Sequence, residues 1–302
     1  MVDATQNPSD QPVVGVLGCG LVTPYGAGAG IDLLSDDRPE RCGQESPYWS
    51  VPEQVLAGAA ELAAEVRRDR TSWMAGVALA LACRDAGVVL SDSPPERVAL
   101  VLGCALAGQL GMIDFADEVR AQSPRFVSPI HFPQTVGNYT AGVLSRAFKI
   151  RGPNLTLSTG ASAGLQAVAN ACSLLRDGLA DLAIAGGVEV LSEGMVRGLG
   201  GSQFGETNAR VWSEGACIYL LSRSTDGFPK PVRATIVEWS GDAAEAGDGE
   251  TFQAADLVGR SLAAESAMRI AMAIMAGGRK PGRAVVRCSE GDGACVLIVE
   301  VP

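Results

Sequence analysis

The stretch LTLSTGASAG, residues 155–164, identifies the fold class more directly than any other part of this sequence. Residues 155–158 alternate leucine with a hydroxyl residue and predict a strand. Gly160 predicts a tight turn, and residues 163–176 predict a helix. A strand that runs through a tight turn into a helix is typical of α/β proteins, in which helices cover a central sheet. The sequence therefore predicts an α/β protein.

The same stretch contains the pattern G-x-S-x-G at residues 160–164, which in α/β-hydrolases places a nucleophilic serine on the turn. Taken alone, it predicts a hydrolase that uses Ser162. That mechanism needs a histidine to accept the serine proton, and in these enzymes the histidine follows the serine along the chain. The single histidine, His131, precedes Ser162, so the hydrolase hypothesis lacks a base. We expect His131 to be hydrogen-bonded in a loop or at an interface.

Other apolar runs alternate with helical segments along the chain. We expect Gly186-Gly187 to close the strand before it and Gly291-Asp292-Gly293 to form the turn of a C-terminal hairpin. Residues 241–250 are acidic and rich in glycine, which is typical of a surface loop. Strands are predicted at residues 13–18, 97–102, 182–185, 216–221, 232–238, 283–288 and 294–301, and helices at residues 56–66, 73–86, 111–121 and 254–276.

The charge balance argues against nucleic acid as a partner. The 302-residue chain has 24 Lys and Arg against 34 Asp and Glu, a formal net charge of −10. A surface that neutralises phosphates needs clustered positive charge. The longest basic cluster is Arg67-Arg68 with Arg70, which we expect to flank a helix as a solvated face.

The remaining composition indicates a reduced, cytoplasmic protein without a metal site. Eight cysteines are scattered with no C-x-x-C pair, and one histidine leaves little material for a zinc site. Residues 1–12 are polar and are expected to form a flexible tail rather than a signal peptide. No apolar stretch is long enough to span a bilayer without a glycine or a charged residue, so no membrane contact is predicted.

Gly18-Cys19-Gly20 is a candidate dinucleotide-binding turn, with Asp36 near the distance of the expected acidic residue. The third glycine of that fingerprint is replaced by Thr23, and Pro24 follows at once. A partial pattern of this kind is weak evidence, and no cofactor is predicted.

Six ordered motifs between residues 13 and 222 together resemble those of the β-ketoacyl synthases. Residues 159–164 are similar to the nucleophile segment of that family, T-A-C-x-S-G. The resemblance implies a thiolase-like fold, layered α-β-α-β-α, in which residues 13–230 are the ketosynthase-like N-terminal half and residues 231–302 are a truncated C-terminal half of the same core. The other similar segments are residues 14–28 (V-x-G-x-G-x-V-T-P-x-G), 132–138 (F-P-N-T-x-x-N), 151–154 (R-G-P-N), 185–189 (A-G-G-x-E) and 212–216 (x-G-E-G-A).

The resemblance also implies that the catalytic residues are missing. In ketosynthases a cysteine at the helix N-terminus takes the acyl chain, and two histidines help to decarboxylate the extender unit. The cysteine position corresponds to Ala161, and alanine cannot hold a thioester. The segment with the first histidine, H-G-T-G-T, is absent, and residues 242–251 stand in place of a longer stretch. Arg260 follows Gly259 at the position of the second histidine.

A chain with this scaffold and no nucleophile resembles the chain-length factors of type II polyketide synthases, which pair with an active ketosynthase. Aromatic chain-length factors have Gln where this chain has Ala161, and they keep most of the C-terminal half. The resemblance is therefore closer to the short factors of the highly reducing, polyene-forming systems. The implied partners are an active ketosynthase subunit and an acyl carrier protein that carries the growing chain.

In that family the acyl tunnel runs towards the dimer interface, where residues of the factor close its end. Two alternatives stay open: a carrier-protein-binding scaffold that shapes no product, and a stand-alone decarboxylase or hydrolase that uses Ser162. The residues expected to close the tunnel share one helical face and the loop beside it: Gln109, Met112, Ile113, Phe115, Phe132 and Gln134.

Overall fold

The structure is a computed structural model and describes residues 13–30, 32–34, 48–59, 61, 63–200, 211–224, 226–240, 260–279, 281–288 and 295–302. No helix among these residues is long and apolar enough to cross a membrane. Five features expected from the sequence lie outside them: the tail at residues 1–12, Asp36, the acidic loop at residues 241–250, the replacing segment 242–251 and the turn at residues 291–293.

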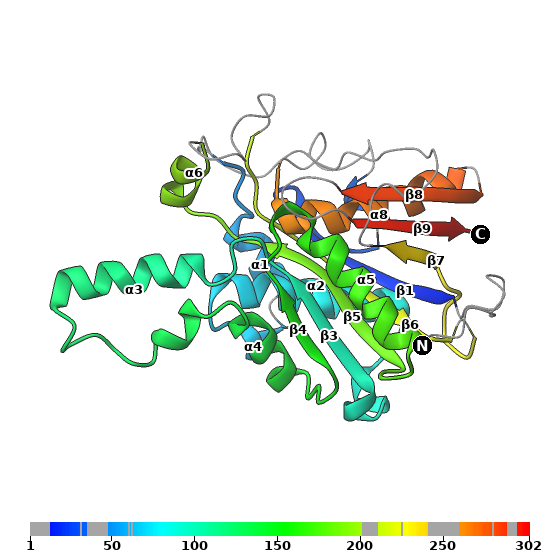
Figure 1. Cartoon of the computed structure of the whole chain (residues 1–302), viewed down its shortest axis with the longest axis horizontal. Helices are drawn as coiled ribbons and strands as arrows, with labels where there is room; N and C mark the ends of the chain where they lie inside the picture. Colours follow the sequence, from blue (N-terminus) through cyan, green and yellow to red (C-terminus); the bar gives the residue numbers. More distant parts are fainter. Residues whose placement is uncertain are drawn as a thin grey trace, which may run out of the picture.

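The described strands form one nine-stranded mixed sheet in the order β4-β3-β5-β6-β1-β7-β9-β8, with β2 paired to β1 (Figure 1). β3 runs parallel to β4 and β5, and all other neighbours are antiparallel. Each predicted strand is present, and β2 is an addition. The strands are β1 (Val14–Thr23), β2 (Gly26–Ala29), β3 (Val98–Gly103), β4 (Asn154–Leu157), β5 (Leu182–Glu189), β6 (Gly215–Ser222), β7 (Ala234–Ser240), β8 (Gly282–Cys288) and β9 (Cys295–Val301).

The predicted helices at residues 73–86 and 163–176 are confirmed as α2 and α5. The prediction of one helix over residues 56–66 is wrong, because α1 ends at Gly58 and Ala64–Val66 form a separate 3₁₀ turn. Glycine is a poor residue for a helix interior. The α-helices of the described residues are α1 (Glu53–Gly58), α2 (Arg70–Ala86), α3 (Gln109–Gln122), α4 (Tyr139–Ala147), α5 (Ala163–Arg176), α6 (Glu193–Gly200) and α8 (Leu262–Arg279).

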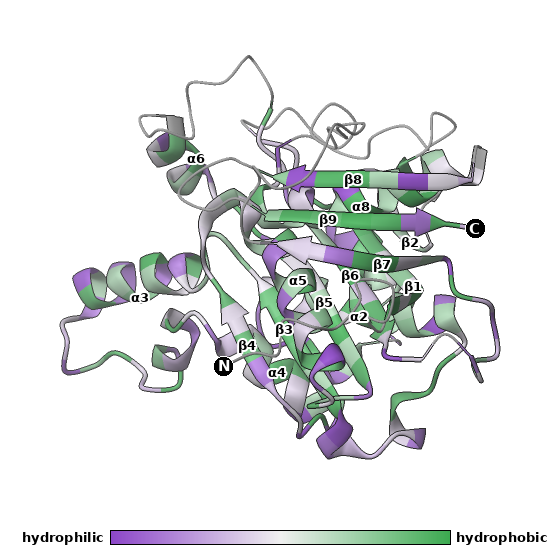
Figure 2. Cartoon of the chain, turned by 45° about the vertical axis from the view of Figure 1, so that its right-hand side comes forward, coloured by the Kyte–Doolittle hydropathy of each residue, from purple (hydrophilic) through white to green (hydrophobic). Residues whose placement is uncertain are grey.

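The side chains of the central strands alternate between two hydrophobic cores. Along β3, Leu100 and Leu102 pack in the core that contains α2 and α4, whereas Ala99 and Val101 pack in the core that contains α5 and α8. This alternation is the period of two that a strand buried on both faces requires. Consistent with burial on both faces, β5 is hydrophobic along most of its length (Figure 2).

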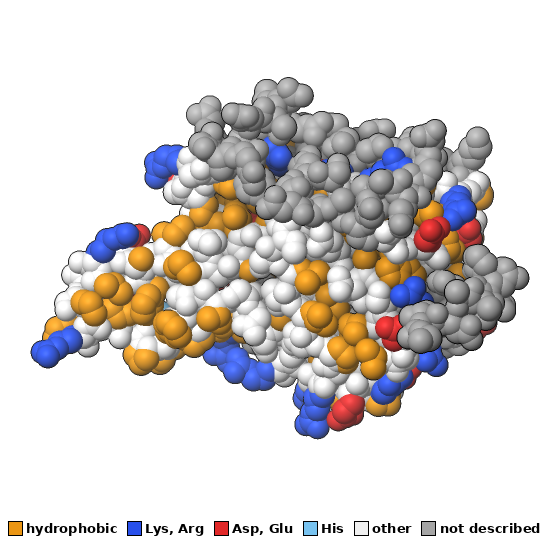
Figure 3. All heavy atoms as spheres, in the orientation of Figure 1, with side chains coloured by type: hydrophobic (Ala, Val, Ile, Leu, Met, Phe, Trp, Pro, Cys, Tyr) orange, Lys and Arg blue, Asp and Glu red, His pale blue; other side chains and the backbone are white. Residues whose placement is uncertain are grey.

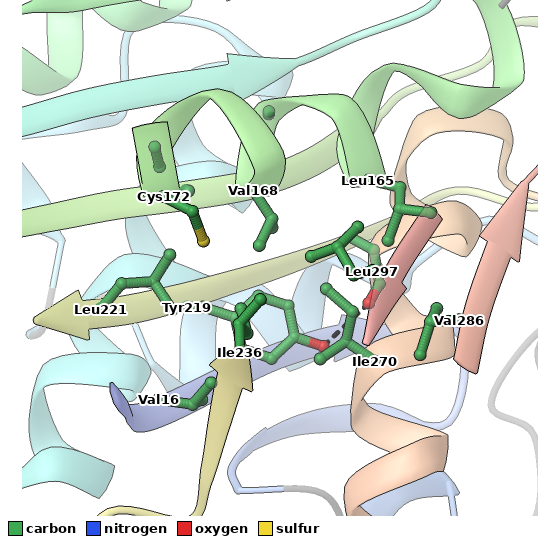
Figure 4. Close-up of a cluster of buried hydrophobic side chains, with 14 of the residues drawn as sticks. Val16, Leu165, Val168, Cys172, Tyr219, Leu221, Ile236, Ile270, Val286 and Leu297 are labelled. Carbon is green, nitrogen blue, oxygen red and sulfur yellow. Dashed lines mark hydrogen bonds between the residues drawn. The ribbon is translucent and has the colours of Figure 1, made fainter. Parts of the chain in front are cut away.

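The helices α5 and α8 are enclosed by strands on both sides. α5 contacts β3, β5 and β9, and α8 contacts β5 and β6 as well as β8 and β9. Between them lie Leu165 and Val168 of α5, Ile270 of α8 and Leu297 of β9 (Figure 4). The single sheet therefore has α2 and α4 in the core on one face and α5 and α8 in the core on the other.

Backbone lies against backbone where α8 begins. A Cβ atom added to Gly164 of α5 or to Gly187 of β5 would come within 2.0 or 2.2 Å of the carbonyl oxygen of Ala263. The prediction that Gly186-Gly187 closes a strand is therefore wrong, because β5 continues through both residues to Glu189. These glycines are needed for close packing and not for a turn.

The close approach of α5 and α8 generates a stability prediction. Replacing Gly164 with Ala is expected to lower the free energy of unfolding by about 1–3 kcal/mol, because the added carbon must displace the α8 backbone. Gly142 of α4 is a matched control: it is also helical, and an added Cβ would meet nothing within 4 Å. Gly142→Ala is expected to stabilise by about 0.5–1 kcal/mol. Urea unfolding at one fixed protein concentration measures both, and equal effects would contradict the tight approach.

Candidate functional site

The predicted tight turn joins β4 to α5 and holds a buried alanine. Gly160 has the left-handed φ of 78° that a glycine tolerates best, and Gly160–Ser162 form a 3₁₀ turn that leads into α5. The side chain of Ala161 is buried at 4% exposure. The residue that a nucleophile would occupy therefore has neither a reactive group nor access to solvent in this chain.

Ser162, the other candidate nucleophile, is fully buried in a small amide network. The Ser162 hydroxyl accepts a hydrogen bond from the Gln166 side chain at 3.0 Å and donates one to the Thr159 carbonyl at 3.5 Å. The Thr159 hydroxyl donates to the side-chain oxygen of Gln166 at 2.7 Å. Neither partner can accept the serine proton as a base, so these contacts order the turn rather than activate Ser162.

His131 lies in the loop after α3, as expected. Its side chain is half exposed, and its Nδ1 atom is 2.8 Å from a carboxylate oxygen of Glu118. The hydrogen bond from His131 lowers the pKa of the Glu118 carboxyl. His131 therefore pairs with a surface carboxylate of the same region.

Arg260 is buried just before α8. Its guanidinium lies 5.0 Å from the centre of the Trp212 ring, and its backbone bonds to Val211 and Ser213, each at 2.8 Å. The position of the family's second histidine is therefore taken by a guanidinium in cation–π contact with Trp212.

The basic cluster before α2 is only partly a solvated face, and the expectation is corrected for Arg70. Its guanidinium donates at 3.0 Å to a carboxylate oxygen of Glu214, which is fully buried. The same carboxylate accepts the backbone N–H groups of Val51 at 2.9 Å and Leu191 at 3.2 Å. Arg70 therefore neutralises a buried charge, which would otherwise be very costly.

A second buried carboxylate, Glu189, lies at the end of β5. It accepts the backbone N–H groups of Ala105 at 2.9 Å and Leu106 at 3.0 Å, the thiol of Cys104 at 3.5 Å, and a backbone hydrogen bond from Ala263. Burial raises the pKa of its carboxyl from 4.5 to about 7 in spite of these bonds. Burial and the nearby Glu189 charge also raise the pKa of Cys104 far above its ordinary value.

A cavity of about 260 Å³ lies next to Glu189 at the C-terminal ends of β3 and β5. Gly108, Leu110 and Gly111 form one wall, and Gln134 and Val136 lie along the same cavity. The other residues around it are Arg68, Asp69, Arg70, Thr71, Leu102, Cys104, Leu106, Ala107, Asp114, Gly137, Tyr139, Thr140, Ala141, Thr156, Val188 and Val190. Its wall is mixed, with apolar side chains beside several charged ones.

Residues 105–138 form an arm that projects from the body of the molecule and comprises α3, the loop after it and the 3₁₀ turn Phe132–Thr135 (Figure 1). Apolar side chains gather on it (Figure 3). The most exposed are Phe126 at 74% and Ile130 at 77%. The other large apolar side chains exposed on the arm are Met112, Ile113, Phe132 and Val136.

The six residues predicted to close a tunnel all lie on this arm, but they do not converge on one cavity. Gln134 lines the cavity beside Glu189. Phe115 and Phe132 contact each other edge to face, with ring centroids 5.9 Å apart. Gln109, Met112 and Ile113 are exposed.

The comparisons with known proteins agree with the motifs. The family model of the β-ketoacyl synthase N-terminal domain matches residues 55–226, more than half of the chain. The chain belongs to the β-ketoacyl synthase family. It is 29% identical over 196 residues to the 3-oxoacyl-[acyl-carrier-protein] synthase 2 of Rhizobium meliloti, covering 58% of this chain and 46% of that protein. It is 33% identical over 112 residues to the Vibrio cholerae enzyme of the same name, covering 37% of this chain and 27% of that protein. The chain spans less than half the length of these curated relatives.

Solved structures of ketosynthases share the fold of this family member over nearly its whole length. The ishigamide ketosynthase/chain length factor superposes with a TM-score of 0.73 at 18% identity, covering 96% of this chain and 99% of that one. A ketosynthase in complex with its chain length factor from Xenorhabdus doucetiae gives 0.69 at 16% identity, covering 98% and 100%. The thiolase-like fold predicted from the motifs is thus confirmed.

The sequence did not assign a role to the two buried carboxylates of this ketosynthase-like chain. Glu189 and Glu214 are the acidic residues of A-G-G-x-E and x-G-E-G-A. The sequence did contain one indication of their role: each carboxylate stands next to an apolar strand. A carboxylate in such a place is buried only when other groups compensate its charge, so a hydrogen-bonding role could have been predicted.

The raised pKa of Glu189 predicts a pH dependence of stability. The folded chain holds the Glu189 proton up to about pH 7, whereas an unfolded chain loses it near 4.5. This contribution to stability is therefore complete below the unfolded pKa and lost as the pH rises through 7. Between pH 5 and pH 8 it is expected to fall by on the order of 2–3 kcal/mol.

Glu189→Gln mimics the protonated form and is expected to remove this part of the pH dependence. Urea unfolding of both proteins at pH 5 and pH 8 measures the difference. The same change in unfolding free energy with pH in both proteins would contradict the prediction.

Proposed function

We propose that this chain is a non-catalytic chain-length factor that pairs with an active ketosynthase in a type II polyketide synthase. In this role it has no turnover of its own and shapes the end of the tunnel that receives the growing acyl chain from an acyl carrier protein. Within that class we place it with the highly reducing, polyene-forming systems, because it has Ala rather than Gln at position 161 and only residues 242–251 in place of a longer stretch.

The observation that carries the proposal is the side chain at the nucleophile position. The turn and helix of the family are intact, yet Ala161 offers no group that can hold a thioester. Ser162 is bonded to Gln166 and not to a base, and Arg260 stacks on Trp212. A subunit that keeps the fold but lacks the catalytic groups can still contribute to a complex in which its partner catalyses the reaction.

Two surfaces support a partner. β4 is at one end of the sheet and pairs only with β3 among the described strands, so its outer edge can continue into a strand of another subunit. The arm (residues 105–138) exposes Phe126 and Ile130, and exposed apolar clusters of this kind are typical of protein interfaces. Obligate interfaces commonly bury more than about 2,000 Å², so we expect the partner to cover both surfaces.

The arm also carries the residues that we propose for the tunnel end. Phe115 and Phe132 form an edge-to-face pair on it, and Met112 is exposed where a partner would cover it. In this proposal a chain that grows from the partner's cysteine stops where it meets these side chains. The polyketide synthase complexes among the similar structures, such as a ketosynthase bound to its acyl carrier protein, support the choice of partners.

The first prediction of this proposal concerns the partner surface. Ile130→Asp is expected to weaken the complex with a co-expressed ketosynthase by at least about 100-fold, because the charge would be buried without a partner. Val89→Asp is the matched control, since Val89 is also exposed, at 60%, but lies outside the arm. Co-purification and light scattering measure the one-to-one complex. Equal effects of the two substitutions, or a stable wild-type monomer beside the ketosynthase, would contradict the proposal.

The second prediction concerns the product. In the reconstituted pair, Phe115→Ala or Met112→Ala is expected to lengthen the product, and Gln109→Trp to shorten it, because a bulky group at a closed end stops growth sterically. Mass spectrometry of carrier-bound chains measures the length distribution. Changes in yield without a change in length would favour a carrier-binding scaffold instead. Turnover by the purified chain alone, lost in Ser162→Ala, would favour a stand-alone enzyme.

A further inference from the structure

We propose that Glu189 is a positioning residue that fixes the base of the arm and thereby the place at which the acyl chain ends. The inference deepens the proposed function and rests on it for the second half, the effect on chain length. The first half, the anchoring of the arm, concerns this chain alone.

The arm is joined to the sheet by a turn that is hydrogen-bonded to the side chain of Glu189. β3 ends at Gly103, and the turn at residues 105–108 leads into α3. The carboxylate of Glu189 accepts the N–H groups of Ala105 and Leu106, the first two residues of this turn, at 2.9 and 3.0 Å. Two hydrogen bonds from adjacent amides to one buried carboxyl group fix both the position and the direction of the turn.

Among the described residues, no side chain caps the start of α3 with a hydrogen bond. Its N-cap residue is Gly108, which has a left-handed φ of 74° and offers no side chain for a capping bond. Gly108 also lies against the carbonyl of Thr135, so that an added Cβ would come within 2.5 Å of the oxygen. A displacement of the turn at residues 105–108 would therefore move α3 and the segment around Thr135 together.

The same carboxylate connects the arm with the rest of the site. It accepts a backbone hydrogen bond from Ala263 at the beginning of α8. Ala263 lies against Gly164 of α5, close to Ala161. Glu189 thus ties the arm to the helices that carry the nucleophile position.

Other titratable or charged groups share the surroundings of Glu189, and a test must separate them. Arg70 is paired with Glu214, and the charge of Asp69 acts on the thiol of Cys104. The titratable or charged groups that line the same cavity are Arg68, Asp69, Arg70, Cys104, Asp114 and Tyr139. Among the described residues, Glu189 alone is hydrogen-bonded through its side chain to the amides of Ala105 and Leu106.

The test uses the full chain, with its ketosynthase where the two co-purify, and two variants. Glu189→Gln removes the charge from the turn. Glu214→Gln is the matched control, since Glu214 is equally buried and also accepts backbone N–H groups, but from Val51 and Leu191. At pH 8, where Glu189 has lost its proton, amide hydrogen exchange of the peptide spanning residues 104–110 is expected to become about tenfold faster in Glu189→Gln only, because bonds to a charged acceptor are lost.

A spectroscopic readout identifies the bond itself. With ¹⁵N-labelled leucine, the amide resonance of Leu106, assigned by its loss in Leu106→Met, is expected to titrate near pH 7. It should move downfield as the carboxylate forms, because a charged acceptor strengthens the hydrogen bond. Glu189→Gln is expected to abolish the titration, and Glu214→Gln to leave it. A Leu106 resonance that ignores pH, or exchange that rises equally in both variants, would overturn the anchoring role.

The length of the product tests the second half. In the reconstituted pair Glu189→Gln is expected to shift the distribution of chain lengths by at least one extension step, whereas Glu214→Gln should change only the yield. An unchanged distribution with faster exchange would overturn the link between arm position and chain length. If no ketosynthase pairs with the chain, the proposed function fails, and the exchange and resonance data still decide whether Glu189 anchors the arm.

Discussion

The peptide group of Ala263 lies where three parts of the chain meet, and their packing depends on it. Its carbonyl lies so close to Gly164 and Gly187 that neither position has room for a Cβ atom. The hydroxyl of Ser266 donates to the same oxygen at 2.9 Å and accepts the N–H of Leu165 at 3.2 Å. Because α5 begins only two residues before Leu165, this contact also fixes the turn that precedes it. The shape of the turn therefore follows from packing and not from the side chain at position 161.

Buried carboxylates complete the polar interior of the scaffold. Asp85 accepts the N–H of Cys19 at 2.9 Å and pairs with Arg233, while Glu189 and Glu214 bind backbone N–H groups of other segments. A buried charge is tolerated only when such bonds replace water. Each carboxylate consequently joins segments that are far apart in sequence, and the family scaffold stays defined although the reactive groups have changed.

In the proposed function, the arm is a part of this chain that contacts the partner subunit. The chain has a formal net charge of −10, yet Phe126, Ile130 and Phe132 are more than half exposed on the arm. Apolar area exposed in this way favours association, because burying it removes it from water. In the proposed function the subunit contributes by shape: Glu189 is proposed to fix the base of the arm, and a partner is proposed to cover its apolar tip.

Local patterns in the sequence determined the α/β class, the limits of α5 and the alanine at position 161. Each depends on neighbours along the chain, since helical periodicity, strand runs and motif spacing are local properties. They also predicted that Phe115 and Phe132 lie close together, but they did not predict how exposed these side chains are.

Only the tertiary structure decided why Gly187 lies within a strand, why Arg70 pairs with a buried carboxylate and which amides Glu189 binds. The partners that decide these three cases are Ala263, Glu214 and the amides of residues 105 and 106, all distant in sequence. Crowding by a backbone oxygen and compensation of a buried charge require atoms that folding brings together. A pattern in consecutive residues does not contain those atoms.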